Sequence, residues 1–246
     1  MPVKTHKFNS RFFHALVLIS VFVLLAGCQS PRAISEPASA NAKPTAPPNT
    51  GAITSPAAES TDHRQLVVML GDSLTAGYGL DAAMAWPALL QQRLDEKGLR
   101  YRVVNKGISG DTSAGGLRRI EDALQGDVKL MVLELGGNDL LRGLSVADLK
   151  KNLSQMIEIA QRRKITVILA GMEAPPNYGA DFTHDFRNVY RDLAKQYKVI
   201  LIPFFLEGVG GIESLNQPDG IHPNEKGAVI VMENVWHVLE PVLGRR

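Results

Sequence analysis

Leu66-Val67-Val68-Met69-Leu70-Gly71-Asp72-Ser73-Leu74 is the stretch of sequence that decides the fold. Its five apolar residues predict a fully buried strand over residues 66–70, and Gly71 predicts a sharp turn directly after it. Ser73 then stands at the carboxyl end of the strand, where open parallel sheets bind their ligands. That position suits a nucleophile, but a turn serine that bonds only its own backbone fits the same pattern.

Four more apolar runs follow, and they alternate with segments of helical periodicity. Strands are predicted over residues 101–105, 129–135, 165–169 and 199–202, and helices over residues 85–98, 113–124, 146–163, 181–197 and 225–239. One face of the helix over 146–163 carries Leu149, Leu153, Met156, Ile157 and Ala160. This alternation predicts an α/β sandwich, doubly wound around a mainly parallel five-stranded sheet.

The first three predicted strands each end in a short polar loop, with Ser73, Gly110 and Asn138 in turn. In a parallel sheet these loops share one rim. Asp219 and His222 lie in a loop just before the last predicted helix, and this loop can reach the same rim. A serine nucleophile needs a histidine base, and the histidine needs a carboxylate to set its tautomer. Ser73, His222 and Asp219 fill these roles. The N–H groups of Ser73 and Gly110 and the Asn138 amide are the candidate donors to an oxyanion.

These segments, in this order, resemble the four conserved blocks of the SGNH (GDSL) hydrolases. The blocks are Gly71-Asp72-Ser73-Leu74, Gly107-Ile108-Ser109-Gly110-Asp111-Thr112-Ser113, Gly136-Gly137-Asn138-Asp139 and Asp219-Gly220-Ile221-His222-Pro223-Asn224. The segments Leu133–Asp139 and Pro176–Gly179 are most similar to small bacterial periplasmic thioesterases, arylesterases and lysophospholipases. The G-x-S-x-G elbow of α/β-hydrolases is not present, because the second glycine is missing after Ser73.

The resemblance implies a flavodoxin-like three-layer α/β/α sandwich and a Ser-His-Asp mechanism without metal or cofactor. The implied catalytic residues are Ser73, Asp219 and His222, and the implied oxyanion hole is Ser73, Gly110 and Asn138. The implied substrates are short or medium acyl esters, aryl esters, thioesters or lysophospholipids. Two alternatives remain: a carbohydrate O-deacetylase, and a non-catalytic envelope lipoprotein that uses the same fold.

Other polar residues in the blocks have simpler interpretations. Asp72, Asp139 and Asp111 are expected to bond loop backbone rather than to act as bases. Glu134 lies in a buried strand and is expected to be structural, with a partner. Tyr78 and Leu80 line an acyl pocket or merely pack.

The N-terminal segment predicts export. Residues 1–27 combine Lys4, Lys7 and Arg11 with an apolar run that is too short to span a bilayer, as in a signal peptide. The run ends in Leu25-Ala26-Gly27-Cys28, which resembles a bacterial lipoprotein signal and implies acylation of Cys28; an ordinary cleavable signal is the alternative. Gln29 favours the outer membrane, facing the periplasm, over retention at the inner membrane. A free periplasmic protein is the alternative location.

Residues 28–62 are predicted to be a disordered tether behind the lipidated cysteine, and residues 63–246 the hydrolase domain. The tether holds six of the 14 prolines and lacks apolar periodicity. Its reach lies between roughly 30 Å as a coil and roughly 100 Å when extended.

Charge and cysteine content exclude several classes of protein. Without residues 1–27, 24 basic residues face 25 acidic ones, a formal charge of −1, so no basic excess is present to bind nucleic acid. Cys28 is the only cysteine, so the domain has no disulfide, no thiolate metal site and no cysteine nucleophile. The expected partners are a small acyl substrate and, through Cys28, a membrane.

Overall fold

The computed structural model describes residues 63–244. Its sheet consists of β1 (Gln65–Gly71), β2 (Tyr101–Gly107), β3 (Val128–Glu134), β4 (Thr166–Ala170) and β5 (Ile200–Ile202). All neighbouring strands are parallel, and their order is β2-β1-β3-β4-β5. This is the flavodoxin-like order, in which ligands bind at the carboxyl ends of the strands.

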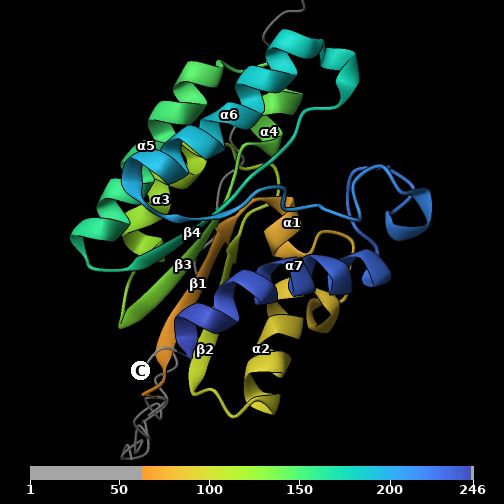
Figure 1. Ribbon diagram of the computed structural model, residues 1–246. Helices are drawn as coiled ribbons and strands as arrows, with labels where there is room; N and C mark the ends of the chain where they lie inside the picture. Colours follow the sequence, from red (N-terminus) through yellow and green to blue (C-terminus); the bar gives the residue numbers. More distant parts are fainter. Residues whose placement is uncertain (1–62, 245–246) are drawn as a thin grey trace, which may run out of the picture. The chain divides into compact units, whose positions relative to one another are not determined.

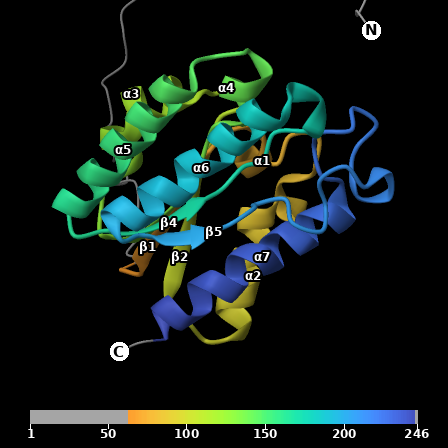
Figure 2. The same ribbon diagram turned by 45° about the horizontal axis from the view of Figure 1, so that its top comes forward.

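Helices cover both faces of the sheet and complete the predicted three layers (Figure 1). The long helices are α2 (Trp86–Glu96), α3 (Ser113–Ala123), α5 (Val146–Arg162), α6 (Ala180–Tyr197) and α7 (Glu225–Leu243). Figure 2 shows α3, α5 and α6 together on one side of the sheet and α2 and α7 on the other. The predicted fold class is therefore confirmed.

The buried surface follows the predicted apolar pattern. Residues 67–70 of β1 are completely inaccessible to solvent, as expected for a central strand covered on both faces. All five residues of the predicted stripe on α5 are buried. On α2, Gly98 follows the helix with a φ of +66°, the left-handed conformation in which glycine ends helices.

Five short helical turns lie where no helix was expected. Among them, α1 (Ser73–Ala76) and α4 (Gly137–Leu141) follow β1 and β3 directly; the others are 3-10 turns at Ala82–Met84, Pro176–Tyr178 and Glu213–Leu215. Both α1 and α4 are too short to show a helical period. The last helix also exceeds its prediction and continues past Pro241 to Leu243. Leu239 and Leu243 lie on the same face and are both buried, so packing outweighs the proline.

The register of the sheet brings the strand ends level. Gly71 at the end of β1 is paired with Gly107 of β2 and with Glu134 of β3. The three segments that follow these residues therefore leave the sheet at one rim, where the predicted site residues were expected to meet.

Candidate active site

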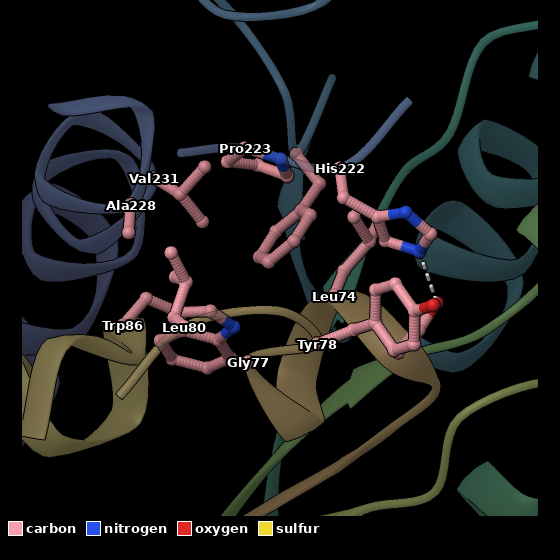
Figure 3. A pocket seen from close by; sticks show the side chains of 11 residues that line it. Leu74, Gly77, Tyr78, Leu80, Trp86, His222, Pro223, Ala228 and Val231 are labelled. Atoms are coloured by element: carbon pink, nitrogen blue, oxygen red, sulfur yellow. Dashed lines mark hydrogen bonds between the residues drawn. The ribbon is translucent and has the colours of Figure 1, made fainter. Parts of the chain in front are cut away.

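Ser73 stands where β1 turns into α1. Asp72 is the N-cap of the helix and Ser73 is its first residue. The turn requires Gly71, because a Cβ there would lie 2.1 Å from Thr75 Oγ1. The Ser73 hydroxyl lies 2.9 Å from His222 Nε2, and Figure 3 shows this hydrogen bond as a dashed line. Ser73 is therefore not a turn serine that bonds only its own backbone.

Asp219 holds the other side of the His222 ring. Its Oδ2 lies 2.7 Å from His222 Nδ1, and its Oδ1 accepts the backbone N–H groups of Ile221 and His222, each at 3.0 Å. Desolvation raises the pKa of Asp219, but the hydrogen bonds from the His222 ring and from the two N–H groups outweigh it and lower the pKa to about 2. The ionised carboxylate accepts from Nδ1–H, so the lone pair of Nε2 faces Ser73.

Gln217 fixes the loop that carries His222, and sequence reasoning did not single it out. Its backbone N–H donates to the carbonyl of His222 at 2.7 Å. Its side-chain amide donates to the carbonyls of Tyr78, at 2.7 Å, and Pro223, at 3.0 Å. Gly79 makes room for it, since a Cβ at 79 would lie 2.1 Å from Gln217 Oε1. Gln217 thus joins the histidine loop to the loop after Ser73.

Gly110 and Asn138 line the same cavity as Ser73 and His222. Gly110 has a φ of +79°, a conformation that favours glycine, and its carbonyl accepts a hydrogen bond from Arg142 Nη2 at 2.6 Å. Ser73 lies in the first turn of α1, where backbone N–H groups have no acceptor within the helix. The structure therefore brings the predicted triad and the predicted oxyanion donors to one rim.

Asp72 and Asp139 support these groups, and neither contacts His222 by a hydrogen bond. Asp72 Oδ1 accepts the N–H of Leu74 at 3.0 Å, as expected for a residue that bonds loop backbone, and Oδ2 also accepts Asn138 Nδ2 at 3.0 Å. Asp139 accepts both the backbone N–H and the hydroxyl of Ser113, at 2.8 and 2.5 Å. Through Asp139, the start of α3 holds α4 in place.

The expectation that Asp111 bonds loop backbone is wrong. Its carboxylate forms an ion pair with Arg119, with Oδ2 2.7 Å from Nε, and no bond to loop backbone is present among residues 63–244. Arg119 also donates to the carbonyls of Lys106 and Gly71, at 2.6 and 2.8 Å. The Arg119 guanidinium has five N–H donors, so it can bind the Asp111 carboxylate and the carbonyls at the ends of two strands at once. The backbone N–H groups of a local turn do not offer this combination.

Glu134 is buried and structural, as expected. Its Oε2 accepts the Thr75 hydroxyl at 2.7 Å and the N–H of Asp72 at 3.3 Å. Burial and the neighbouring charge of Asp72 raise the pKa of Glu134 well above its ordinary value. Burial likewise raises the pKa of Asp72 to about 6, against the opposing effect of the hydrogen bonds from Leu74 and Asn138. Glu134 thereby ties the end of β3 to the turn that carries Ser73.

An open cavity of about 570 Å³ adjoins the Ser73 hydroxyl. Much of its wall is apolar and consists of Leu140, Leu141, Met172, Ala174, Pro175, Pro176, Phe204, Leu206 and Ile221. A second cavity of about 10 Å³, room for about one water molecule, also borders Ser73 and His222, and its wall includes Leu80, Trp86 and Val231 (Figure 3). Tyr78 borders both, with its ring centroid 4.7 Å from that of His222. Leu80 borders only the small cavity.

The remaining expectations concern metals and the N-terminus. In residues 63–244, no three His, Cys, Asp or Glu side chains are grouped so that they could hold a metal ion. Within the same range, no helix is long and apolar enough to cross a membrane. The predicted signal over 1–27, the acylated Cys28 and the tether over 28–62 lie outside the described residues.

Known proteins are similar to this chain in both sequence and fold. Residues 69–230 match the GDSL-like lipase/acylhydrolase family. The chain is 49% identical over 181 residues to the esterase TesA of Pseudomonas aeruginosa, which covers 73% of this chain and 90% of that protein. It is 38% identical over 178 residues to an Escherichia coli protein named as a thioesterase, protease and lysophospholipase, covering 72% of this chain and 84% of the relative.

The crystal structure of a TesA matches this fold with a TM-score of 0.70 at 48% sequence identity, covering 72% of this chain and 99% of that one. The family match spans most of the described domain and includes Ser73 and His222. On these grounds the chain belongs to the family of GDSL-like lipases and acylhydrolases.

Proposed function

We propose that this protein is a serine hydrolase that cleaves carboxylic esters and thioesters through an acyl-enzyme on Ser73. The observation that carries the proposal is the chain of short contacts from Ser73 through His222 to Asp219. Membership of a family of lipases and acylhydrolases supports it, as do the relatives named as an esterase and as a thioesterase and lysophospholipase.

Acylation follows from the geometry of the three side chains. Ser73 Oγ attacks the carbonyl carbon of the ester while its proton passes to His222 Nε2, 2.9 Å away. The imidazolium that forms is stabilised by Asp219, which remains ionised because its pKa is about 2. The same Nε2–H then protonates the leaving alcohol or thiol as the carbon–oxygen or carbon–sulfur bond breaks.

The carbonyl oxygen becomes negatively charged in the tetrahedral intermediate. The N–H groups of Ser73 and Gly110 and the amide of Asn138, all at the wall of one cavity, are the donors that we assign to it. Deacylation repeats the cycle with water, which gives its proton to His222 and its oxygen to the acyl carbon. The carboxylic acid leaves, and Ser73 regains its proton.

The cavity beside Ser73 favours an apolar acyl group. Its volume of about 570 Å³ and its wall of leucine, methionine, proline and phenylalanine side chains suit a short to medium hydrocarbon chain. The apolar side chains of this wall offer a sugar no hydrogen bonds, which favours an acyl ester over the substrate of a carbohydrate O-deacetylase, the alternative within enzymes. Aryl esters and lysophospholipids remain within the proposed substrate class.

The test is hydrolysis by the purified domain of a panel that runs from p-nitrophenyl acetate to palmitate, with acyl-coenzyme A, a lysophospholipid and an acetylated sugar. We expect kcat/KM to peak at a short or medium acyl chain and to vanish in Ser73→Ala. A preference for the acetylated sugar would instead support the deacetylase. No turnover of any substrate by the folded wild type would support the non-catalytic alternative.

We further propose that the protein is an envelope lipoprotein held by an acylated Cys28 at the outer membrane, facing the periplasm. The support is in the sequence: a basic and apolar segment ends in Leu25-Ala26-Gly27-Cys28, and Gln29 follows. The tether over 28–62, about 30 to 100 Å in reach, would let the hydrolase act on substrates at or near the membrane surface. A free periplasmic enzyme is the alternative.

A further inference from the structure

Asp72 links the start of α1, the helix whose first residue is Ser73, to the candidate oxyanion donor Asn138. It is 2% exposed, and its two carboxylate oxygens have different partners. Oδ1 accepts the N–H of Leu74 and so caps α1, whereas Oδ2 accepts Asn138 Nδ2, both at 3.0 Å. Asn138 lies 66 positions further along the chain, so this second bond is a tertiary contact and plays no part in capping.

We propose that Asp72 is a positioning residue of the oxyanion hole: its carboxylate holds the Asn138 amide so that an N–H points toward the oxyanion formed on Ser73. This inference rests on the proposed serine hydrolase activity. It assigns to Asp72 no contact with the substrate and no proton transfer.

The amide of Asn138 needs such a partner because its two ends are similar in shape and opposite in function. Rotation of the amide by 180° would turn a carbonyl oxygen toward the oxyanion and replace an attraction by a repulsion. An ionised carboxylate can only accept, so Asp72 binds the NH₂ end and repels the carbonyl end. The NH₂ group has two hydrogens, and with one on Asp72 the other remains for the substrate.

Asp72 is itself held from behind. Its backbone N–H donates to Glu134 Oε2, which also accepts the Thr75 hydroxyl. Glu134 is completely buried at the end of β3, four residues before Asn138. Since Gly71 and Glu134 are paired in the sheet, the two sides of the Asp72–Asn138 bond are fixed to neighbouring strands. This is the rigid support that a preorganised donor requires.

The simpler explanation is that Asp72 only caps α1. A cap needs one acceptor oxygen, which serine or asparagine supplies equally well without a buried charge. The helix has only four residues, and burial makes the ionised form of Asp72 costly, as its raised pKa indicates. The titratable groups that interact with Asp72 are Glu134, His222 and Asp111. A buried carboxylate at position 72 suits the orientation of the Asn138 amide, a role that asparagine cannot fill.

Asp72→Asn separates the two explanations. The new side chain keeps an oxygen for the Leu74 N–H but turns an NH₂ group toward Asn138, which favours the reversed amide. With p-nitrophenyl butyrate we expect kcat to fall about 10²-fold, KM to stay within about threefold and the melting temperature to be equal or higher. In the Asn138→Ala background the same change should lower kcat less than about threefold further, because its target is gone.

Asp72→Ser is the second variant, since serine caps helices but is too short to reach Asn138. We expect the same loss of kcat and the same dependence on Asn138. The ¹⁵N signal of the Asn138 side-chain amide, assigned by its absence in Asn138→Ala, should shift in both variants.

Any one of three results would overturn the proposal. The Asp72 variants could lose as much kcat without the Asn138 side chain as with it, the Asn138 amide signal could stay unshifted, or Asp72→Asn could keep the wild-type kcat. These outcomes differ from failure of the proposed function, in which the folded wild type itself hydrolyses no ester.

Discussion

Replacing Asp219 by asparagine isolates the role of one oxygen atom. Asparagine keeps an Oδ1 that can accept the N–H groups of Ile221 and His222, so the loop should keep its shape. Only the group opposite His222 Nδ1 changes, from an accepting oxygen to a donating NH₂. The imidazole must then carry its proton on Nε2, where it donates to Ser73 instead of accepting from it.

The size of the effect follows from this reversed tautomer. The equivalent change in a serine protease triad lowers kcat about 10⁴-fold, or roughly 5.5 kcal/mol of transition-state stabilisation. Here the Asp219 side chain is 38% exposed, so water can partly replace it beside the ring. We therefore expect a decrease in kcat of about 10³- to 10⁴-fold for Asp219→Asn, with little change in KM.

The assay is steady-state hydrolysis of p-nitrophenyl butyrate, with circular dichroism to confirm the fold. Asp185→Asn is the matched control, because Asp185 is also an exposed aspartate beside a histidine, with Oδ1 3.4 Å from His184 Nδ1 on α6. It should leave kcat unchanged. A decrease of less than tenfold in well-folded Asp219→Asn, or a loss confined to KM, would refute the role derived for Asp219.

Three further predictions concern other parts of the molecule. Asn138→Ala should lower kcat about 10²- to 10³-fold with little change in KM. Asn138→Asp should lower kcat further, because a carboxylate repels the oxyanion. A loss of thermal stability in parallel with the loss of activity would instead indicate that Asn138 only braces the loop. Asp72 has a pKa raised to about 6 in the folded protein, so its ionisation makes the wild type lose stability as the pH rises from about 4 to above 6. Asp72→Asn should remove up to roughly 3 kcal/mol of that loss at neutral pH, measured by urea unfolding at pH 4 and 7.5. Wild-type protein should incorporate an alkyne fatty acid and fractionate with outer membranes, whereas Cys28→Ser should do neither; an unlabelled wild type would indicate an ordinary signal peptide or none.

Much of the fold was predictable because its signals are local. The central strand β1 is a continuous apolar run, which predicts burial on both faces. The apolar residues of α5 repeat at helical spacing, which predicts burial on one face. The helices α1 and α4 were not predicted, because four or five residues cannot show a period. They form because Asp72 caps the first and Gly136, with a φ of +126°, allows the sharp turn before the second.

The candidate site was predictable as a set of blocks, whereas most of the contacts that position it were not. The resemblance to a hydrolase family indicated Ser73, Gly110, Asn138, Asp219 and His222 together. Nothing local marks Gln217, whose bond to the Tyr78 carbonyl spans 139 positions in the sequence.

The bond from Asn138 to Asp72 and the bonds of Arg119 to two strand ends are likewise tertiary. Arg119 also explains the wrong expectation for Asp111, whose carboxylate is engaged by a side chain eight residues away. Such contacts depend on the register of β1 against its neighbours, which an isolated sequence does not reveal.

The central claim is that Ser73 forms the covalent acyl-enzyme, and an active-site phosphonate tests it directly. After reaction of the wild type with a p-nitrophenyl alkylphosphonate, peptide mass spectrometry should find one adduct, on Ser73, in step with the loss of esterase activity. Ser73→Ala should keep its melting curve, lose hydrolysis and take up no label. An adduct on another residue of an inactivated wild type, or full activity in Ser73→Ala, would contradict the account.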